Sequence, residues 1–184
     1  MNVLILGSGG REHAFAYKIR QSLLCKNLYV APGNSGTSKI ASNLEIQVNQ
    51  FEQIAEAIKN LNVSLVVVGP EVPLVNGLTD FIKGNKDLKD TIVIGPNKHA
   101  AQLEGSKDFA KDFLNRHNIP TASHKTFTAE NINDAFFYID EMKAPYVLKA
   151  DGLAAGKGVL IIDNPDEAKN EIHEMLINSK FGDA

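Results

Sequence analysis

Short runs of apolar residues alternate with segments of helical periodicity through the first half of the chain. The runs are too short for core helices and are followed by glycine, proline or asparagine, a pattern typical of strands buried in a parallel sheet. The predicted strands cover residues 3–6, 28–30, 45–48, 64–68 and 91–94. The predicted helices cover residues 11–17, 51–60 and 73–82. On the first helix we expect Ala14 and Tyr17, with Leu24 beyond its end, to face the sheet.

This alternation predicts an α/β fold, in which helices cover a parallel sheet. Loops with glycine follow several of the predicted strands, at residues 7–10, 33–36, 69–71 and 95. Because parallel strands end at one edge of their sheet, these loops are expected to converge. The sequence therefore predicts a site for a small phosphorylated substrate at that edge.

The first glycine loop has the make-up of an anion site. A strand, a glycine turn and a helix N-terminus direct N–H groups and the positive end of the helix dipole to one point. Arg11 adds a fork of donors that suits a phosphate. A dinucleotide is disfavoured, because Glu12 stands where G-x-G-x-x-G needs a small residue, and no acidic residue appears between Glu12 and Glu45. A purely structural glycine turn remains the alternative.

The pattern changes near Gly105. Ser106 is expected to cap a helix over residues 107–115, which Pro120 and its neighbours end. Further along we predict a helix at 130–142, strands at 145–150 and 158–162, and a helix at 165–178. The predicted organisation is an α/β domain at residues 1–104, a connecting helix and linker at 105–125, and a smaller unit at 126–184.

A second glycine loop joins the last two predicted strands. It is not a P-loop, because three residues rather than four separate Gly152 from Gly156, and Gly158 replaces the hydroxyl that would hold magnesium. A strand follows it, not a helix. A glycine-rich hairpin can instead close over nucleotide phosphates with its N–H groups.

Two charged residues flank this loop. Lys149 either points to solvent or aims into a cleft to neutralise phosphate, and Lys157 inside the loop favours the second interpretation. Asp151 is interpreted as a turn residue.

Composition narrows the class of protein further. The 184 residues carry 19 basic and 22 acidic side chains, a formal charge of −3 without a dense basic stripe, so nucleic acid is not an expected partner. No apolar run is long enough to cross a membrane, and the N-terminus lacks a signal-peptide pattern. The single cysteine, Cys25, excludes an internal disulfide framework and a cysteine metal cluster. We expect a cytoplasmic protein.

Four motifs in order resemble the phosphoribosylamine–glycine ligase family of the ATP-grasp superfamily. They lie at residues 7–14, 32–37, 69–74 and 146–159, and a helix start at 105–111 is similar to the ATP-grasp entry helix. The resemblance implies a Rossmann-like, parallel-sheet N-terminal domain followed by the glycine-loop lid subdomain of an ATP-grasp domain. It also implies a reaction of purine synthesis: ATP-dependent ligation of glycine to 5-phosphoribosylamine, giving glycinamide ribonucleotide, ADP and phosphate.

Residue by residue, the resemblance implies a site for each large substrate. The phosphoribosylamine site would include Gly9, Gly10, Arg11, Glu12, Gly33, Asn34, Gly36, Thr37, Glu71 and Pro73. The ATP site would include Lys107, Lys149, Gly152, Ala155, Gly156, Lys157 and Gly158. No side chain is expected to act as catalytic base or nucleophile, and His13 is interpreted as structural.

The resemblance ends before a second ATP-grasp subdomain, which would carry the ligands of Mg²⁺ or Mn²⁺. The chain is therefore expected to be an N-terminal portion, inactive alone, whose partners are small molecules rather than nucleic acid or membrane. The alternatives are another ATP-grasp carboxylate–amine ligase and a non-catalytic nucleotide- or phosphate-binding module. The sequence does not indicate the oligomeric state.

Overall fold

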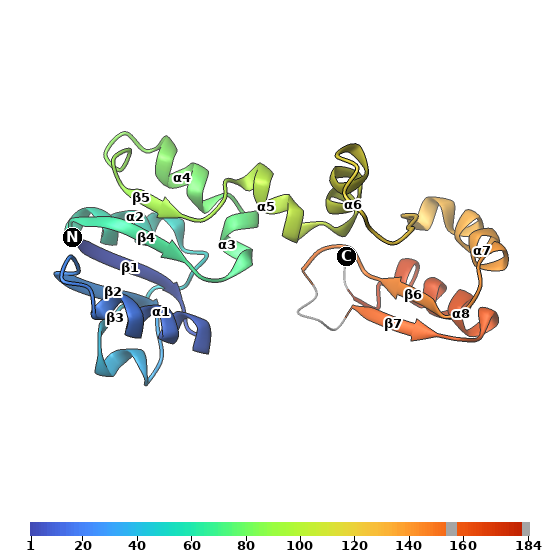
Figure 1. The fold of residues 1–184 in the computed structure, drawn as a ribbon, viewed down its shortest axis with the longest axis horizontal. Coiled ribbons are helices and arrows are strands. Elements are labelled where there is room, and N and C mark those ends of the chain that lie inside the picture. The colour runs from blue at the N-terminus through green and yellow to red at the C-terminus, as the bar shows by residue number, and fades with distance from the viewer. Residues whose placement is uncertain (154–157, 182–184) are drawn as a thin grey trace. The chain divides into compact units, whose positions relative to one another are not determined.

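A computed structural model describes residues 1–153 and 158–181 and divides the chain into two compact units, Met1–Gln102 and Leu103–Ala184. The first unit contains a five-stranded sheet in the order β3-β2-β1-β4-β5 (Figure 1), and every pair of neighbouring strands is parallel. The strands are β1 (Asn2–Gly7), β2 (Asn27–Pro32), β3 (Ser42–Asn43), β4 (Val63–Val68) and β5 (Ile92–Ile94). The predicted α/β class is confirmed.

Helices connect these strands and cover both faces of the sheet. They are α1 (Gly10–Arg20), η1 (Thr37–Lys39), α2 (Phe51–Asn60), α3 (Glu71–Val75), α4 (Leu78–Gly84) and α5 (Lys98–Gly105), in which the division between the units falls. Successive side chains of a strand point to opposite faces. Val3 and Ile5 of β1 therefore pack with Ala16 of α1, while Leu4 and Leu6 pack with α2 and α4. Burial on both faces explains why residues 3–6 of β1 are all apolar.

The face of α1 that packs on the sheet differs from the expected one. Tyr17 is 62% exposed and Leu24 73% exposed, whereas Ala16 is fully buried and Glu12 is only 5% exposed. The buried positions therefore follow Glu12, Ala16 and the half-buried Ile19 at helical spacing. Ala14 is exposed as well. The prediction was wrong because the first buried position of this helix is a carboxylate, which the apolar pattern does not reveal.

The predicted strand at residues 45–48 is also wrong. Strand β3 lies just before it, and Ile46 N donates to the carbonyl of Leu44 at 2.8 Å, so the chain turns there. Leu44, Ile46 and Val48 still pack against the core from this irregular segment. Their alternation reflects burial on one side, which a segment without strand pairing can also show.

The predicted helix at residues 73–82 is two helices. The first, α3, ends at Val75, and α4 begins at Leu78. Between them Gly77 has φ +94°, a left-handed conformation that glycine adopts without steric cost and that interrupts a right-handed helix. Pro73 lies in the first turn of α3, where a missing N–H is tolerated.

The second unit is built on an antiparallel hairpin of β6 (Tyr146–Lys149) and β7 (Val159–Ile162), as predicted. Its helices are α6 (Lys107–Arg116), η2 (Ala129–Asn131), α7 (Ile132–Glu141) and α8 (Pro165–Leu176). Helices α7 and α8 pack on the hairpin through Ala135, Ile139, Ala168 and Ile172. Ser106 caps α6 as predicted, because its hydroxyl accepts from Phe109 N at 3.1 Å. Among the described residues, the structure contains no helix of sufficient length and apolar character to cross a membrane.

Candidate functional site

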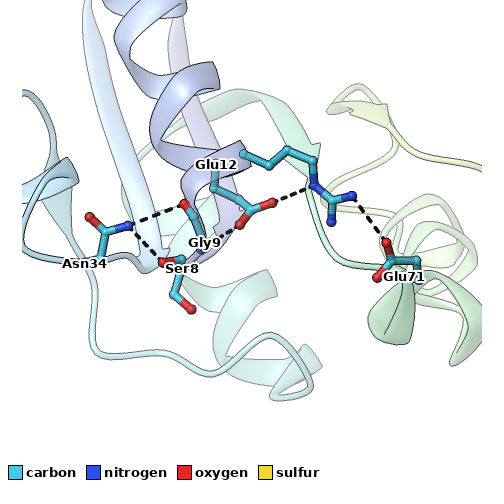
Figure 2. Close-up of polar contacts among 6 residues, drawn as sticks. Ser8, Gly9, Glu12, Asn34 and Glu71 are labelled. Carbon is cyan, nitrogen blue, oxygen red and sulfur yellow. Dashed lines mark hydrogen bonds and ion pairs between the residues drawn. The ribbon is translucent and has the colours of Figure 1, made fainter. Parts of the chain in front are cut away.

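The turn between β1 and α1 is closed by the side chain of Glu12. Its Oε2 accepts a hydrogen bond of 2.7 Å from Gly9 N, and its Oε1 lies 3.0 Å from Arg11 Nε (Figure 2). The carboxylate is thus a capping partner for the start of its own helix. A negative charge at a helix N-terminus is also favoured by the helix dipole.

Glu12 occupies space that three glycines leave open. A Cβ at Gly7, Gly9 or Gly69 would overlap the Glu12 side chain. Gly7 ends β1 and Gly69 follows β4, so the side chain rests on the carboxyl edge of the sheet. A small residue at position 12, as in a dinucleotide fold, would leave this space empty. Here the Glu12 side chain fills it.

Arg11 joins the first glycine loop to the loop after β4. Its Nη1 lies 3.2 Å from Glu71 Oε1, while Nε is held by Glu12. The pKa of the Arg11 guanidinium is raised above its usual value, mainly by the hydrogen bond to Glu12 and next by the one to Glu71. The pKa of Glu71 is lowered, first by a hydrogen bond from its own backbone N–H and also by Arg11. The Arg11 side chain is about half exposed, so donors that these two contacts do not use can reach a ligand.

Asn34 joins the loop after β2 to the first glycine loop. Its Nδ2 donates to the carbonyl oxygens of Ser8 at 2.8 Å and Gly9 at 3.4 Å (Figure 2). Its Oδ1 accepts from Gly36 N at 2.8 Å and Thr37 N at 3.0 Å. One amide side chain therefore shapes its own loop and connects it to the neighbouring one.

Asn43 of β3 holds the loop after β2 in place, a role that the sequence analysis did not predict. It donates to the carbonyl of Asn34 at 2.8 Å and accepts from Thr37 Oγ1 at 2.8 Å. Thr37 is fully buried, so its hydroxyl holds the loop together and has no exposed surface. A Cβ at Gly33 would overlap Asn43, which explains the glycine there. An isolated asparagine outside a recognisable motif offers no signal from which this role could be predicted.

The loops after β1, β2 and β4 therefore meet, as the sequence predicts for strand ends along one edge. Gly10 begins α1 with open space where a Cβ would stand. Gly36 packs closely on the His13 ring, in line with a structural role for His13. Pro73 is fully buried within α3 and offers no side-chain surface. Gly95, after β5, accepts a hydrogen bond of 3.3 Å from Thr79 and packs on Leu74.

In the second unit, the loop after β6 is fastened to the start of α6. Asp151 Oδ1 accepts from Lys107 N at 2.5 Å and from Asp108 N at 3.4 Å, and Oδ2 accepts from Ser106 Oγ at 3.0 Å. Lys107 Nζ donates to the carbonyl of Gly152 at 2.8 Å. Burial raises the pKa of Asp151, but the hydrogen bonds outweigh it and the pKa lies below its usual value. Asp151 thus does more than start a turn.

A cavity of about 410 Å³ lies in this unit, between the hairpin, the helices and the segment at residues 122–127. Its wall is largely apolar, with Tyr138, Ile139, Ile172 and Leu176 among its members. Lysines are also part of the lining, at positions 107, 111, 125 and 149. Lys149 is exposed and lines the cavity, so the two interpretations of its position are compatible.

The glycine loop itself is described only at its ends. Gly158 is buried, and its carbonyl accepts from Ala150 N at 2.8 Å, which continues the hairpin pairing. Ala155, Gly156 and Lys157 lie outside the described residues. Within the part of the chain that is described, no group of three or more His, Cys, Asp or Glu side chains could hold a metal ion.

Two features together place the chain in the ATP-grasp class. One is an α/β unit whose glycine loops are linked by side-chain contacts. The other is the hairpin that follows it, which has a glycine-rich connection in sequence and lysines that line a cavity. Residues 105–184 match the ATP-grasp (A) domain of phosphoribosylglycinamide synthetase, and residues 1–104 match the N domain of the same enzyme. The chain therefore belongs to the phosphoribosylglycinamide synthetase family.

Curated relatives and solved structures agree with this membership. The chain is 50% identical to a phosphoribosylamine–glycine ligase of Pseudomonas aeruginosa and 47% identical to one of Escherichia coli K12, each over 186 aligned residues. These alignments cover 100% of this chain and 42% of each relative, so the chain spans less than half of their length.

A crystal structure of phosphoribosylamine–glycine ligase from Thermotoga maritima matches with a TM-score of 0.76 and 31% identity, over 100% of this chain and 41% of that one. N5-carboxyaminoimidazole ribonucleotide synthetase of Thermotoga maritima matches with a TM-score of 0.66 and 19% identity, over 92% of this chain and 42% of that one, which supports the fold alone.

Proposed function

We propose that the protein ligates glycine to 5-phosphoribosylamine with ATP, giving glycinamide ribonucleotide, ADP and phosphate. The observation that carries the proposal is the match of both units, in order, to the two domains of one synthetase family. Because the chain spans 42% of its relatives, it would supply the phosphoribosylamine side and part of the ATP side of the complete enzyme. A cytoplasmic location and small-molecule partners belong to the same proposal.

The phosphoribosylamine would bind at the carboxyl edge of the first unit. Arg11 would bind the phosphate or a hydroxyl through donors that Glu12 and Glu71 leave unshared. The amide of Gly10 at the start of α1 would add a donor and the helix dipole. In this proposal Glu12, Asn34 and Thr37 act by holding the loops in place. The further residues of the site would be Gly9, Gly33, Gly36 and Glu71, and the buried Pro73 would act only by shaping the start of α3.

ATP would bind at the second unit. Its apolar cavity suits a base, and Lys107 and Lys149 would neutralise the phosphates. Gly152, Ala155, Gly156, Lys157 and Gly158 would form the loop over them. In the same proposal, Mg²⁺ or Mn²⁺ would be held by side chains of the part of the enzyme that this chain does not span. Phosphoryl transfer depends mostly on positioning and charge neutralisation, which lysines and loop amides can supply without a side-chain nucleophile.

The chemistry would proceed in two steps. The glycine carboxylate would attack the γ-phosphate of ATP, forming an acyl phosphate and releasing ADP. The amine of phosphoribosylamine would then attack the acyl carbon and expel phosphate. The task of this chain is to bind and orient the two phosphate-bearing substrates.

Binding to the isolated chain tests the assignment of the two substrates to the two units. Ribose 5-phosphate and ATP are titrated separately by calorimetry into the parent chain, Arg11→Ala and Lys149→Ala. We expect Arg11→Ala to weaken only the first ligand and Lys149→Ala only the second, each by about tenfold or more. Arg20→Ala on the same helix and Lys143→Ala before β6 are the matched controls and should bind both ligands normally. Weakening of both ligands by one variant would contradict the assignment.

Activity is tested on the complete natural gene product that contains these residues, with the 184-residue chain beside it. ADP release that requires both glycine and fresh phosphoribosylamine supports the ligase. Release with a different carboxylate or amine would indicate another ATP-grasp carboxylate–amine ligase. Binding of both ligands with no ADP release from either protein would indicate a non-catalytic binding module. We expect the 184-residue chain alone to release none.

A further inference from the structure

The carboxylate of Asp151 caps the N-terminus of α6, although Asp151 belongs to a segment distant in sequence. Both of its oxygens are occupied: Oδ1 accepts from the amides of Lys107 and Asp108, and Oδ2 from the hydroxyl of Ser106. These amides belong to the first turn of α6, which has no helical acceptors of its own. The N-terminus of α6 is thus satisfied within the protein and is not free to bind a phosphate.

The same segment holds the side chain of Lys107. Its ammonium donates to the carbonyl of Gly152 at 2.8 Å, directly after Asp151. Gly152 has φ +90°, a conformation that other residues adopt only with strain. Backbone and side chain of Lys107 are therefore both fastened to residues 151–152. An ammonium has three donors, so two remain for a ligand.

Asp151 also lies close to the second lysine of the proposed ATP site. Lys149 ends β6 two residues before Asp151, so a shift of the loop relative to α6 would change the distance between the two ammonium groups. Both lysines line the cavity. Two cations bind one polyphosphate well only when their separation matches the spacing of the phosphates. A fold that already holds them at that separation removes the entropy cost of ordering them when the ligand binds.

We propose that Asp151 is a positioning residue for nucleotide binding, which fastens α6 to the hairpin and so presents Lys107 and Lys149 together to the phosphates. The inference rests on the proposed ATP site and adds to it a residue that does not itself touch the nucleotide. An anionic side chain suits the role, because a carboxylate accepts from several donors at once and bonds them more strongly than a neutral amide.

The test compares ATP with adenosine, which lacks the phosphates. Dissociation constants for both are measured with the 184-residue chain and with Asp151→Asn, which is almost isosteric and keeps one acceptor. We expect Asp151→Asn to lose about tenfold of the preference for ATP over adenosine. The control is Asp108→Asn, which removes a carboxylate of equal charge from the first turn of α6, faces the same cavity, and leaves the three bonds to the Asp151 carboxylate in place. Its preference for ATP should not fall.

A purely structural cap would give a different result. Asp151→Asn would then melt at a lower temperature, while the folded protein would keep its full preference for ATP, and that outcome overturns the inference. Amide hydrogen exchange at Lys107 and Asp108, together with circular dichroism, reports whether the cap has loosened while the fold is intact. Slow exchange at both amides with an unchanged preference also overturns it. A parent chain without any preference for ATP overturns the ATP site itself, and the inference with it.

Discussion

Arg11 Nη1 lies 3.2 Å from Glu71 Oε1, although 60 positions separate the two residues in sequence. The contact joins the start of α1 to the start of α3, across the ends of two adjacent strands. Both side chains are about half exposed, so water screens the pair. The contact therefore organises the two loops without adding much to the stability of the fold.

We expect Arg11→Ala and Glu71→Gln each to lower the free energy of unfolding by less than about 1 kcal/mol. Urea denaturation followed by circular dichroism measures this. Glu71→Gln with Arg11→Ala completes a double-mutant cycle, whose coupling energy should be equally small. A coupling of several kcal/mol would show that the pair is less screened than its exposure indicates.

Removal of the Glu12 side chain should be more costly. Glu12→Ala leaves an empty space among Gly7, Gly9 and Gly69 and an unpaired amide at Gly9, so we expect a loss of about 1–3 kcal/mol. Glu12→Gln keeps the shape and an acceptor, and should lose less. The control is Glu56→Ala, an exposed glutamate within α2, where the change should stay within about 0.5 kcal/mol. Equal effects at positions 12 and 56 would contradict the packing role.

The space between β4 and Glu12 should not tolerate a methyl group. In Gly69→Ala the new Cβ would overlap the carboxyl group of Glu12, and we expect overpacking to cost about 1–3 kcal/mol. Gly84→Ala at the end of α4 is the matched control, because a Cβ there meets nothing within 4 Å. That variant should be as stable as the parent. Chemical denaturation of both proteins makes the comparison, and a neutral Gly69→Ala would mean that Glu12 can move aside freely.

Asp151 should make the second unit sensitive to acid. Its pKa is lowered in the folded protein, so its contribution to stability is present above the unfolded pKa of about 3.9 and is lost as the pH falls through the folded pKa below that value. Two other charged residues lie beside this carboxylate. The ammonium of Lys107 donates to the carbonyl of Gly152, and Asp108 donates its backbone amide to Asp151.

Unfolding of the parent and of Asp151→Asn is measured from pH 7 to pH 2. The difference in stability between them should be largest above about pH 5 and should shrink in acid. Ser106→Ala removes one of the bonds that lower the pKa, so its loss of stability should begin at a higher pH than in the parent. Parallel curves for the parent and Asp151→Asn would contradict the contribution of this carboxylate.

Elements whose two faces are both buried, or whose face is uniformly apolar, could be predicted from the sequence. Strands β1 and β4 and helices α2, α6 and α8 lie close to where their patterns indicate. Two of the failures have one cause, whereas the break between α3 and α4 comes from the left-handed Gly77. Residues 45–48 and the face of α1 were assigned from apolar spacing, but an irregular segment can bury alternate residues, and α1 begins its buried face with Glu12.

The candidate site divides in a similar way. The convergence of the glycine loops could be predicted, because parallel strands end at one edge whatever their partners are. The supporting side chains could not, since Asn43 and Asp151 act on residues that are near only in space. No spacing rule connects Asp151 to Ser106, which lies 45 positions earlier.

The sequence by itself determined the fold class, the alternation of strands and helices and the family, because hydrophobic periodicity and glycine positions can be read from short segments of the chain. Only the tertiary structure decided which polar side chains hold those motifs in place. Glu12 is buried because three glycines make room for it, and Asp151 caps a helix because the hairpin brings it there. Such contacts depend on the packing of segments distant in sequence, and their energies exist only once the chain has folded.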